Sequence, residues 1–153
     1  PMDEIDQYKA FSALIKEGRT PEDIAAQYVD VGDYEDRSVV TIRSDGFFAP
    51  ASNTVPDKMV PLIDRIAEAI DQVPGRVLVI GHSDNTPIRS MRFPSNWHLS
   101  TARAETVAQR MARIVDPGRI RSEGRAESEP IAPNDTAANR AKNRRVEVQV
   151  LVE

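Results

Sequence analysis

Four stretches of the chain carry the hydrophobic patterns of β-strands. Residues 38–43 are rich in β-branched side chains, and the apolar run of residues 76–81 is typical of a strand buried on both faces. A short strand is predicted at residues 119–124. Residues 146–152 alternate between apolar and polar positions, which predicts a strand with one solvated face.

Two longer segments have the spacing of amphipathic helices. The first is expected from about Asp57 to Val73, before Pro74 and Gly75, with one apolar face made of Leu62, Ile63, Ile66, Ile70 and Val73. The second is expected from about Ser95 to Val115, with a buried stripe made of Leu99, Ala102, Thr106, Val107, Met111 and Ile114. Residues 136–142 can add one helical turn.

From residue 37 onward these elements follow the order β-α-β-α-β-(α)-β. Helices that alternate with strands predict an α/β fold (an α+β sandwich), in which helices cover a sheet with at least one right-handed parallel crossover. Functional residues of such folds gather at loops beyond the strand ends. The loop that follows Ile80 is therefore the best candidate.

The first 36 residues differ from the rest of the chain. They hold ten acidic and three basic residues, whereas residues 37–153 hold 14 acidic and 17 basic ones. Helical spacing is visible at Ile5, Tyr8, Phe11, Ala13 and Ile15, and Thr20 with Pro21 can begin a second short helix. We predict that residues 1–36 are an acidic linker or helical segment, with arbitrarily trimmed linker sequence as the alternative, and that residues 37–153 form the domain.

Composition excludes several classes of protein. The absence of cysteine excludes a disulfide scaffold, a cysteine-ligated zinc site and a cysteine nucleophile. No apolar run approaches the roughly 20 residues that span a bilayer, and the acidic first ten residues do not resemble a signal peptide. The small basic excess after residue 36 is too weak to predict nucleic-acid binding. A first residue other than Met is expected of a processed chain or a fragment.

The loop after Ile80 places a carboxylate and a guanidinium near each other. Asp84 is expected at the rim of the sheet, and Arg103 lies one turn after Leu99 on the following helix. One interpretation is an ion pair that fastens the loop to the helix. The other is a polar cleft for a zwitterionic amino acid, with Asp84 on the ammonium group and Arg103 on the carboxylate.

Other candidates carry less weight. His82, Asp84 and His98 lack the spacing of a metal site, and the adjacent His82, Ser83 and Asp84 cannot form a catalytic relay. We therefore expect no enzyme, no metal and no cofactor. Phe93 and Trp97 could stack on a sugar or close the loop onto the core. For the basic run of residues 139–145, either a solvated helix end or the entry of Arg144 or Arg145 into the same cleft is predicted.

Four segments taken together resemble the OmpA-like (OmpA/MotB C-terminal) domain over about residues 37–153: residues 81–85, 96–104, 124–130 and 143–148. The resemblance implies a mixed four-stranded sheet and non-covalent binding of peptidoglycan through the diaminopimelate of its stem peptide. It also implies a binding site made of Asp84, Arg103, Asn85, Asn96, Ser83 and one of Arg144 and Arg145. Ala51 stands where some members carry a ligand-contacting Asn.

Finer features resemble the TssL (DotU/IcmH-like) proteins of type VI secretion more than MotB-type stators. These are residues 37–42, Gly46 with Phe47 and Phe48, and residues 73–77. The resemblance implies a periplasmic domain of an inner-membrane-anchored protein in a Gram-negative bacterium. It would anchor the secretion membrane complex to the cell wall, with the complex's other proteins and a possible homodimer as partners. The alternatives are a structural module with a non-functional cleft and a flagellar stator anchor.

Overall fold

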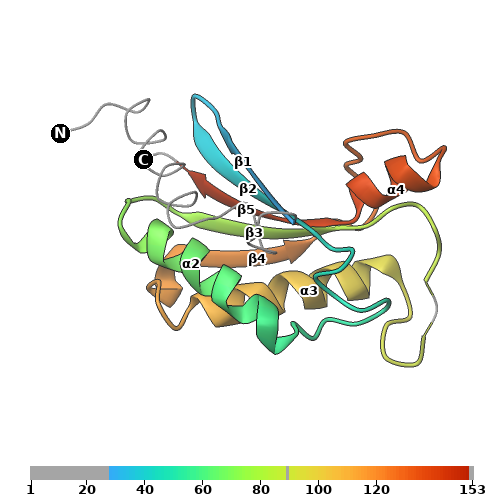
Figure 1. Ribbon diagram of the computed structural model, residues 1–153, viewed down its shortest axis with the longest axis horizontal. Helices are drawn as coiled ribbons and strands as arrows, with labels where there is room; N and C mark the ends of the chain where they lie inside the picture. Colours follow the sequence, from blue (N-terminus) through green and yellow to red (C-terminus); the bar gives the residue numbers. More distant parts are fainter. Residues whose placement is uncertain (1–27, 89, 152–153) are drawn as a thin grey trace.

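The computed structural model describes residues 28–88 and 90–151, which form a five-stranded sheet with helices on one face (Figure 1). The predicted helices in residues 1–27 lie outside the described residues. The strands, in the spatial order β1-β2-β5-β3-β4, are Val29–Asp33, Arg37–Arg43, Arg145–Leu151, Val77–His82 and Ile120–Gly124. The predicted mixed α/β fold is therefore confirmed.

Pairing brings three chain segments to one edge of the sheet. β5 lies antiparallel between β2 and β3, so that Arg43 at the end of β2 and His82 at the end of β3 both pair with Arg145 at the start of β5. β3 and β4 are parallel and joined by the helix α3 (Asn96–Met111), which is the predicted crossover. The loops that follow β2 and β3 therefore meet at the same end of the molecule.

The sheet has one strand more than the sequence predicted. β1 pairs antiparallel with β2, Val29 opposite Ile42 and Asp33 opposite Ser38. Residues 29–33 thus form a strand instead of the linker or helix expected there, while the domain boundary at residue 37 stays a prediction. Gly32 and two aspartates weaken the β-pattern of this strand, and an edge strand with one neighbour tolerates such residues.

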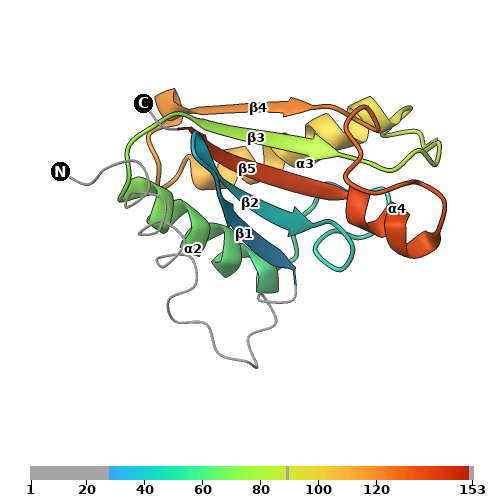
Figure 2. The ribbon, with the colours of Figure 1, turned by 90° about the horizontal axis from the view of Figure 1, so that it is seen from above.

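The hydrophobic core lies between the sheet and two helices (Figure 2). A 3-10 turn, η2 (Asp57–Met59), leads into α2 (Val60–Asp71), and all five predicted apolar positions of this helix region are buried. Of the stripe predicted for the second helix, Leu99, Val107 and Met111 are buried, whereas Ala102, Thr106 and Ile114, which lies beyond the end of α3, are only half-buried. α3 instead approaches the sheet through small side chains: Ser100, Ala104 and Ala108.

On the face away from this core, the side chains of β5 are polar but not solvated, contrary to the prediction for this strand. Gln149 and Arg145 are buried, and Glu147 between them is half-buried. Arg145 donates to Oε2 of Glu147 at 2.7 Å and to the main chain of Glu129 at 3.0 Å, and Arg37 donates to Gln149 at 2.8 Å. Long arginine side chains and the residues 125–134 loop thus replace water on this face.

One further helix completes the end of the sheet where β2 and β3 finish. η3 (Pro117–Arg119) leads into β4 at the opposite end, whereas α4 (Ala137–Asn143) leads into β5 at this one (Figure 2). Gly46 turns the chain after β2 with a φ of 83°, and a Cβ there would lie 2.6 Å from the ring of Tyr28. Among residues 28–88 and 90–151, no helix combines the length and hydrophobicity needed to cross a membrane.

Candidate functional site

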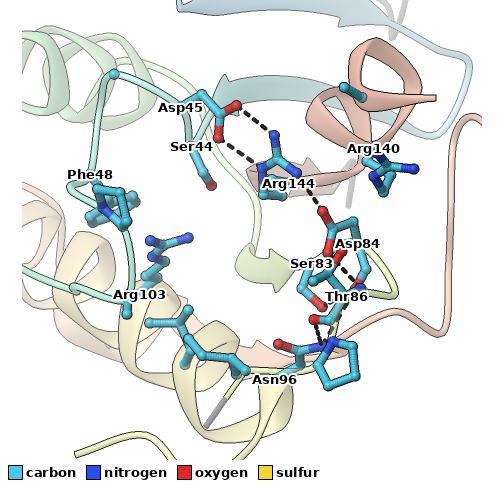
Figure 3. A pocket seen from close by; sticks show the side chains of 17 residues that line it. Ser44, Asp45, Phe48, Ser83, Asp84, Thr86, Asn96, Arg103, Arg140 and Arg144 are labelled. Atoms are coloured by element: carbon cyan, nitrogen blue, oxygen red, sulfur yellow. Dashed lines mark hydrogen bonds and ion pairs between the residues drawn. The ribbon is translucent and has the colours of Figure 1, made fainter. Parts of the chain in front are cut away.

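A cavity of about 700 Å³ opens between the loops after β2 and β3, the start of α3 and the helix α4 (Figure 3). Five of the seven predicted site residues line it: Ser83, Asp84, Asn96, Arg103 and Arg144. Asn85 is exposed and Arg145 is buried elsewhere, so neither contributes to the cavity lining. The cavity therefore lies at the loop after β3, where the topology predicts that functional residues gather.

Asp84 is a buried carboxylate, with 5% of the residue exposed. Its Oδ1 accepts a hydrogen bond from the main-chain N–H of Thr86 at 2.9 Å, which is the local turn that aspartate forms with the residue two positions ahead. Its Oδ2 pairs with Nη1 of Arg144. The carboxylate is thus held by its own loop through Thr86 and by Arg144, the residue that directly precedes β5.

Arg144 bridges two carboxylates (Figure 3). Besides Asp84, it binds Asp45 in a bidentate fork, with Nε to Oδ1 at 2.8 Å and Nη2 to Oδ2 at 2.7 Å. The hydrogen bonds from Arg144 lower the pKa of Asp45, and those to Asp45 and Asp84 raise the pKa of Arg144. Asp45 and Arg144 are therefore charged at neutral pH.

Arg103 does not pair with Asp84, which contradicts the ion-pair interpretation. Its Nε donates to the carbonyl of Ser52 at 2.8 Å, its Nη2 donates to the carbonyl of Ala49 at 3.2 Å, and its guanidinium lies 4.8 Å from the ring centre of Phe48. Burial lowers the pKa of Arg103 to about 10, against the opposing influence of Asp45, so the group stays charged. In the described chain no carboxylate neutralises it.

Asn96 and Ser83 hold the loop in shape. Nδ2 of Asn96 donates to the carbonyl of Thr86 at 3.0 Å, and the hydroxyl of Ser83 donates to the carbonyl of Asp84 at 2.9 Å. Ser95 precedes α3 in an extended conformation and caps it by accepting from the main-chain N–H of His98 at 3.4 Å. The contact between Asn96 and Thr86 ties the loop after β3 to the start of α3. The loop that carries Asp84 is therefore held in place relative to the helix that carries Arg103.

The structure separates the two consecutive arginines that the sequence left open. Neighbouring residues at a strand's start point to opposite sides, so Arg144 enters the cavity while Arg145 extends over the polar face of the sheet. Arg145 is 2% exposed and is held by Glu147 and by main-chain carbonyls. The cavity lining thus includes Arg144 and not Arg145.

Several lining residues escaped the sequence analysis: Ser44, Asp45, Phe48 and Arg140. Asp45 was not among the predicted site residues, although it follows β2, which finishes at the same end of the sheet as β3. Ser44 is 2% exposed, and its hydroxyl has no hydrogen-bond partner among the described residues. Ala51 also lines the cavity, with a φ of 53°.

The remaining candidates of the sequence fall outside this cavity. Phe93 is buried and packs under Arg92, whereas Trp97 has 51% of its surface exposed and does not belong to the core. Within residues 28–88 and 90–151, no three side chains of the metal-binding types gather. The cavity thus offers carboxylates and guanidinium groups on fixed walls, an arrangement suited to a ligand with both an ammonium and a carboxylate.

Comparisons with known proteins agree on one family. The pattern of the OmpA family matches residues 47–144. Motility protein B of Bacillus subtilis (strain 168) is 38% identical over 119 residues, which make up 74% of this chain and 44% of that protein. Outer membrane protein A of Bordetella avium is 34% identical over 116 residues, 73% of this chain and 57% of that protein. The chain therefore spans only about half the length of these curated relatives.

Two solved structures are similar along most of their length. The cell wall anchor of the T6SS from Pseudomonas aeruginosa has 51% identity and a TM-score of 0.82, over 92% of this chain and 96% of that one. The periplasmic domain of Helicobacter pylori MotB has 30% identity and a TM-score of 0.74, over 88% and 86%. The cavity thus lies in a fold shared with these proteins, and the chain belongs to the OmpA family.

Proposed function

We propose that this domain binds peptidoglycan without making or breaking a bond, and thereby anchors a type VI secretion membrane complex to the cell wall. One observation carries the proposal: the cavity holds a charged Arg103 that has no carboxylate partner in the described chain, across from the carboxylate of Asp84. Support also comes from the similarity to the cell wall anchor of Pseudomonas aeruginosa.

The ligand that fits this arrangement is the free amino-acid end of diaminopimelate. Its carboxylate would accept hydrogen bonds from Arg103, which uses only Nε and one Nη2 hydrogen within the protein. Its ammonium would take the place of Arg144 Nη1 at Asp84, while Asp45 keeps Arg144 in position. Each charge-assisted hydrogen bond would contribute about 1.5–3 kcal/mol.

Sedimentation with purified diaminopimelate-type sacculi tests the binding. Asp84→Asn keeps the acceptor for the Thr86 N–H but removes the charge, and Arg103→Lys keeps the charge but removes the fork. Both variants should remain in the supernatant while wild-type protein pellets. Asp71→Asn, an exposed change on α2, serves as the control that still pellets. If both cavity variants pellet like wild type with unchanged circular dichroism, the proposal is refuted.

The machine that uses the anchor is a separate part of the proposal. We place the domain in the periplasm, as part of an inner-membrane-anchored protein, because of the 51% identity to the secretion anchor. The similarity to motility protein B keeps a flagellar stator anchor as the alternative. An Asp84→Asn allele in the producing bacterium should abolish type VI secretion and leave swimming intact, whereas the reverse result would assign the domain to a stator.

A purely structural role is favoured by one feature, the pairing of Arg144 with Asp84, because it occupies the carboxylate that the ligand needs. In that case wild-type protein would fail to pellet with sacculi but would self-associate in analytical ultracentrifugation. Pelleting of a monomeric wild-type protein excludes this role.

A further inference from the structure

We infer that Arg140 forms a second anion-binding subsite in the same cavity, so that the ligand is a stem peptide with a free carboxylate besides the amino-acid end of diaminopimelate. The inference rests on the proposed function and deepens it. It concerns which chemical form of the stem peptide is recognised.

The first argument is the charge balance of the cavity. Its described lining contains three guanidinium groups, from Arg103, Arg140 and Arg144, and two carboxylates, from Asp45 and Asp84. Both carboxylates bind Arg144. Arg103 and Arg140 are thus left without a negatively charged partner in the described chain. A zwitterion adds no net charge, so a ligand with only that end leaves one positive charge uncompensated.

The second argument is the position of Arg140 on α4. It lies four residues before Arg144 on one face, so two like charges are neighbours there. Its side chain makes only a long hydrogen bond, from Nη1 to the carbonyl of Asn134 at 3.4 Å, within the described residues. Most of its donors remain available. A ligand carboxylate at Arg140 would relieve the repulsion between Arg140 and Arg144.

The third argument is the distribution of the two unpaired cations. Arg103 projects from α3 and Arg140 from α4, and Figure 3 shows them on opposite sides of the cavity. The cavity of about 700 Å³ has room for more than one amino-acid end group. A ligand that places one carboxylate at Arg103 and another at Arg140, with its ammonium at Asp84, satisfies every charged group of the lining.

Two carboxylates of the stem peptide could reach Arg140: that of the γ-linked glutamate before diaminopimelate, and the one at the peptide's C-terminus. Calorimetry with alanyl-γ-glutamyl-diaminopimelate, and with its monoamides at each of these two carboxylates, distinguishes them. For wild-type protein, one of the two amides should bind at least fivefold more weakly than the parent peptide. For Arg140→Gln, the parent and that amide should bind equally.

The controls separate charge from folding. Arg121→Gln removes an exposed arginine on β4 and should keep the wild-type preference. Arg140→Lys keeps the charge and should retain part of the preference, and thermal melting checks that both Arg140 variants fold. Equal binding of all three peptides by wild-type protein, or an unchanged preference in Arg140→Gln, overturns the inference alone. If wild-type protein binds none of the peptides, the proposed function fails and the inference fails with it.

Discussion

At the scale of residues, the site is a chain of alternating charges that leads from the loop after β2 to the loop after β3. Asp45 holds Arg144, and Arg144 reaches Asp84. In the proposed binding mode, Asp45 affects binding without touching the ligand, because it holds Arg144 in position when the ammonium group replaces Arg144 at Asp84. A positioning role of this kind predicts that replacing Asp45 lowers the affinity for the ligand but hardly changes the stability of the domain.

Asp45→Asn should weaken binding of a diaminopimelate-containing peptide five- to fiftyfold while changing the melting temperature little. Asp45 is half-exposed, so its loss costs little stability, but Arg144 then competes with the ligand for Asp84. Calorimetric titration measures the loss. Asp30→Asn breaks an exposed aspartate–arginine pair with Arg43 and should leave affinity unchanged. Equal affinities for wild type and Asp45→Asn would contradict the positioning role.

Ala51→Asn should stabilise the domain by up to about 1 kcal/mol, because Asn tolerates the left-handed backbone of this position better than Ala. Its amide would also face the cavity. The same change at Ala126, which has a φ of 48° but is 1% exposed, should destabilise the domain because the amide cannot fit. Chemical denaturation of both variants checks this contrast, and a stability loss at position 51 would count against it.

The sequence predicted that Asp84 and Arg103 face a common cleft, because the loop that carries Asp84 connects a buried strand to the amphipathic helix that carries Arg103. It could not reach Arg140, whose role depends on how α4 sits beside the cavity. It also could not separate Arg144 from Arg145. Which of two adjacent residues faces a site depends on the register of the strand, and a shift of one residue exchanges them.

At the scale of elements, α3 both packs against the sheet and carries residues of the cavity lining, Arg103 among them. It lies so close to the sheet that a Cβ on Gly81 would be 2.0 Å from the carbonyl of Ser100, and one on Gly124 would be 2.2 Å from Oγ1 of Thr101. The two glycines are partners in the register of β3 and β4. This close contact sets the height of Arg103 above the sheet.

Gly81→Ala should therefore destabilise the domain by about 1–3 kcal/mol or more and also weaken ligand binding. The added methyl group would push α3, and Arg103 with it, away from the sheet. Asp84 belongs to the loop after β3 and would not move with α3, so the spacing between Arg103 and Asp84 would change. Gly118→Ala is the matched control, because its Cβ would meet only the Asp116 side chain at 3.3 Å and should change stability little. Denaturation curves of both variants measure the difference, and equal curves would refute the argument.

The elements differ in how far their patterns determine them. α2 and α3 were predicted because their apolar residues recur at helical spacing, and β3 was predicted because it is an uninterrupted apolar run. β1 was missed because its five residues include Gly32 and two aspartates, and it is held by pairing with β2. β5 was placed correctly but was assigned a solvated face. Its polar side chains are instead covered by arginines that come from other segments.

At the scale of the whole molecule, the polar face contains a buried group that the site does not use. His82 is 3% exposed, and neither ring nitrogen has a hydrogen-bond partner among the described residues. Burial and the charge of Arg145 lower its pKa to about 4, against the opposing influence of Glu147, whose Oε2 lies 3.7 Å from Nε2. The folded protein thus keeps this histidine neutral at a pH where the unfolded chain protonates it.

Folding stability should therefore fall as the pH drops from about 6.5 towards 4, because the unfolded state binds a proton that the folded state rejects. His82→Gln removes this contribution and should flatten the dependence in that window. His98, the other histidine, is exposed and provides the control variant His98→Gln, which should keep the wild-type slope. Melting temperatures at half-unit pH steps measure the slopes. Parallel curves for wild type and His82→Gln would rule this out.

The contact between Tyr28 and the turn after β2 has a mechanical consequence. The carbonyl of Tyr28 accepts from the N–H of Arg43 at 2.7 Å, and its ring packs against Gly46, the neighbour of Asp45. A pulling force on the chain ahead of Tyr28 therefore arrives beside Asp45 without crossing the sheet. Under the proposed anchoring function, such a force would act on the loop that positions Arg144, so we expect the ligand affinity of a loaded domain to differ from that of a domain at rest.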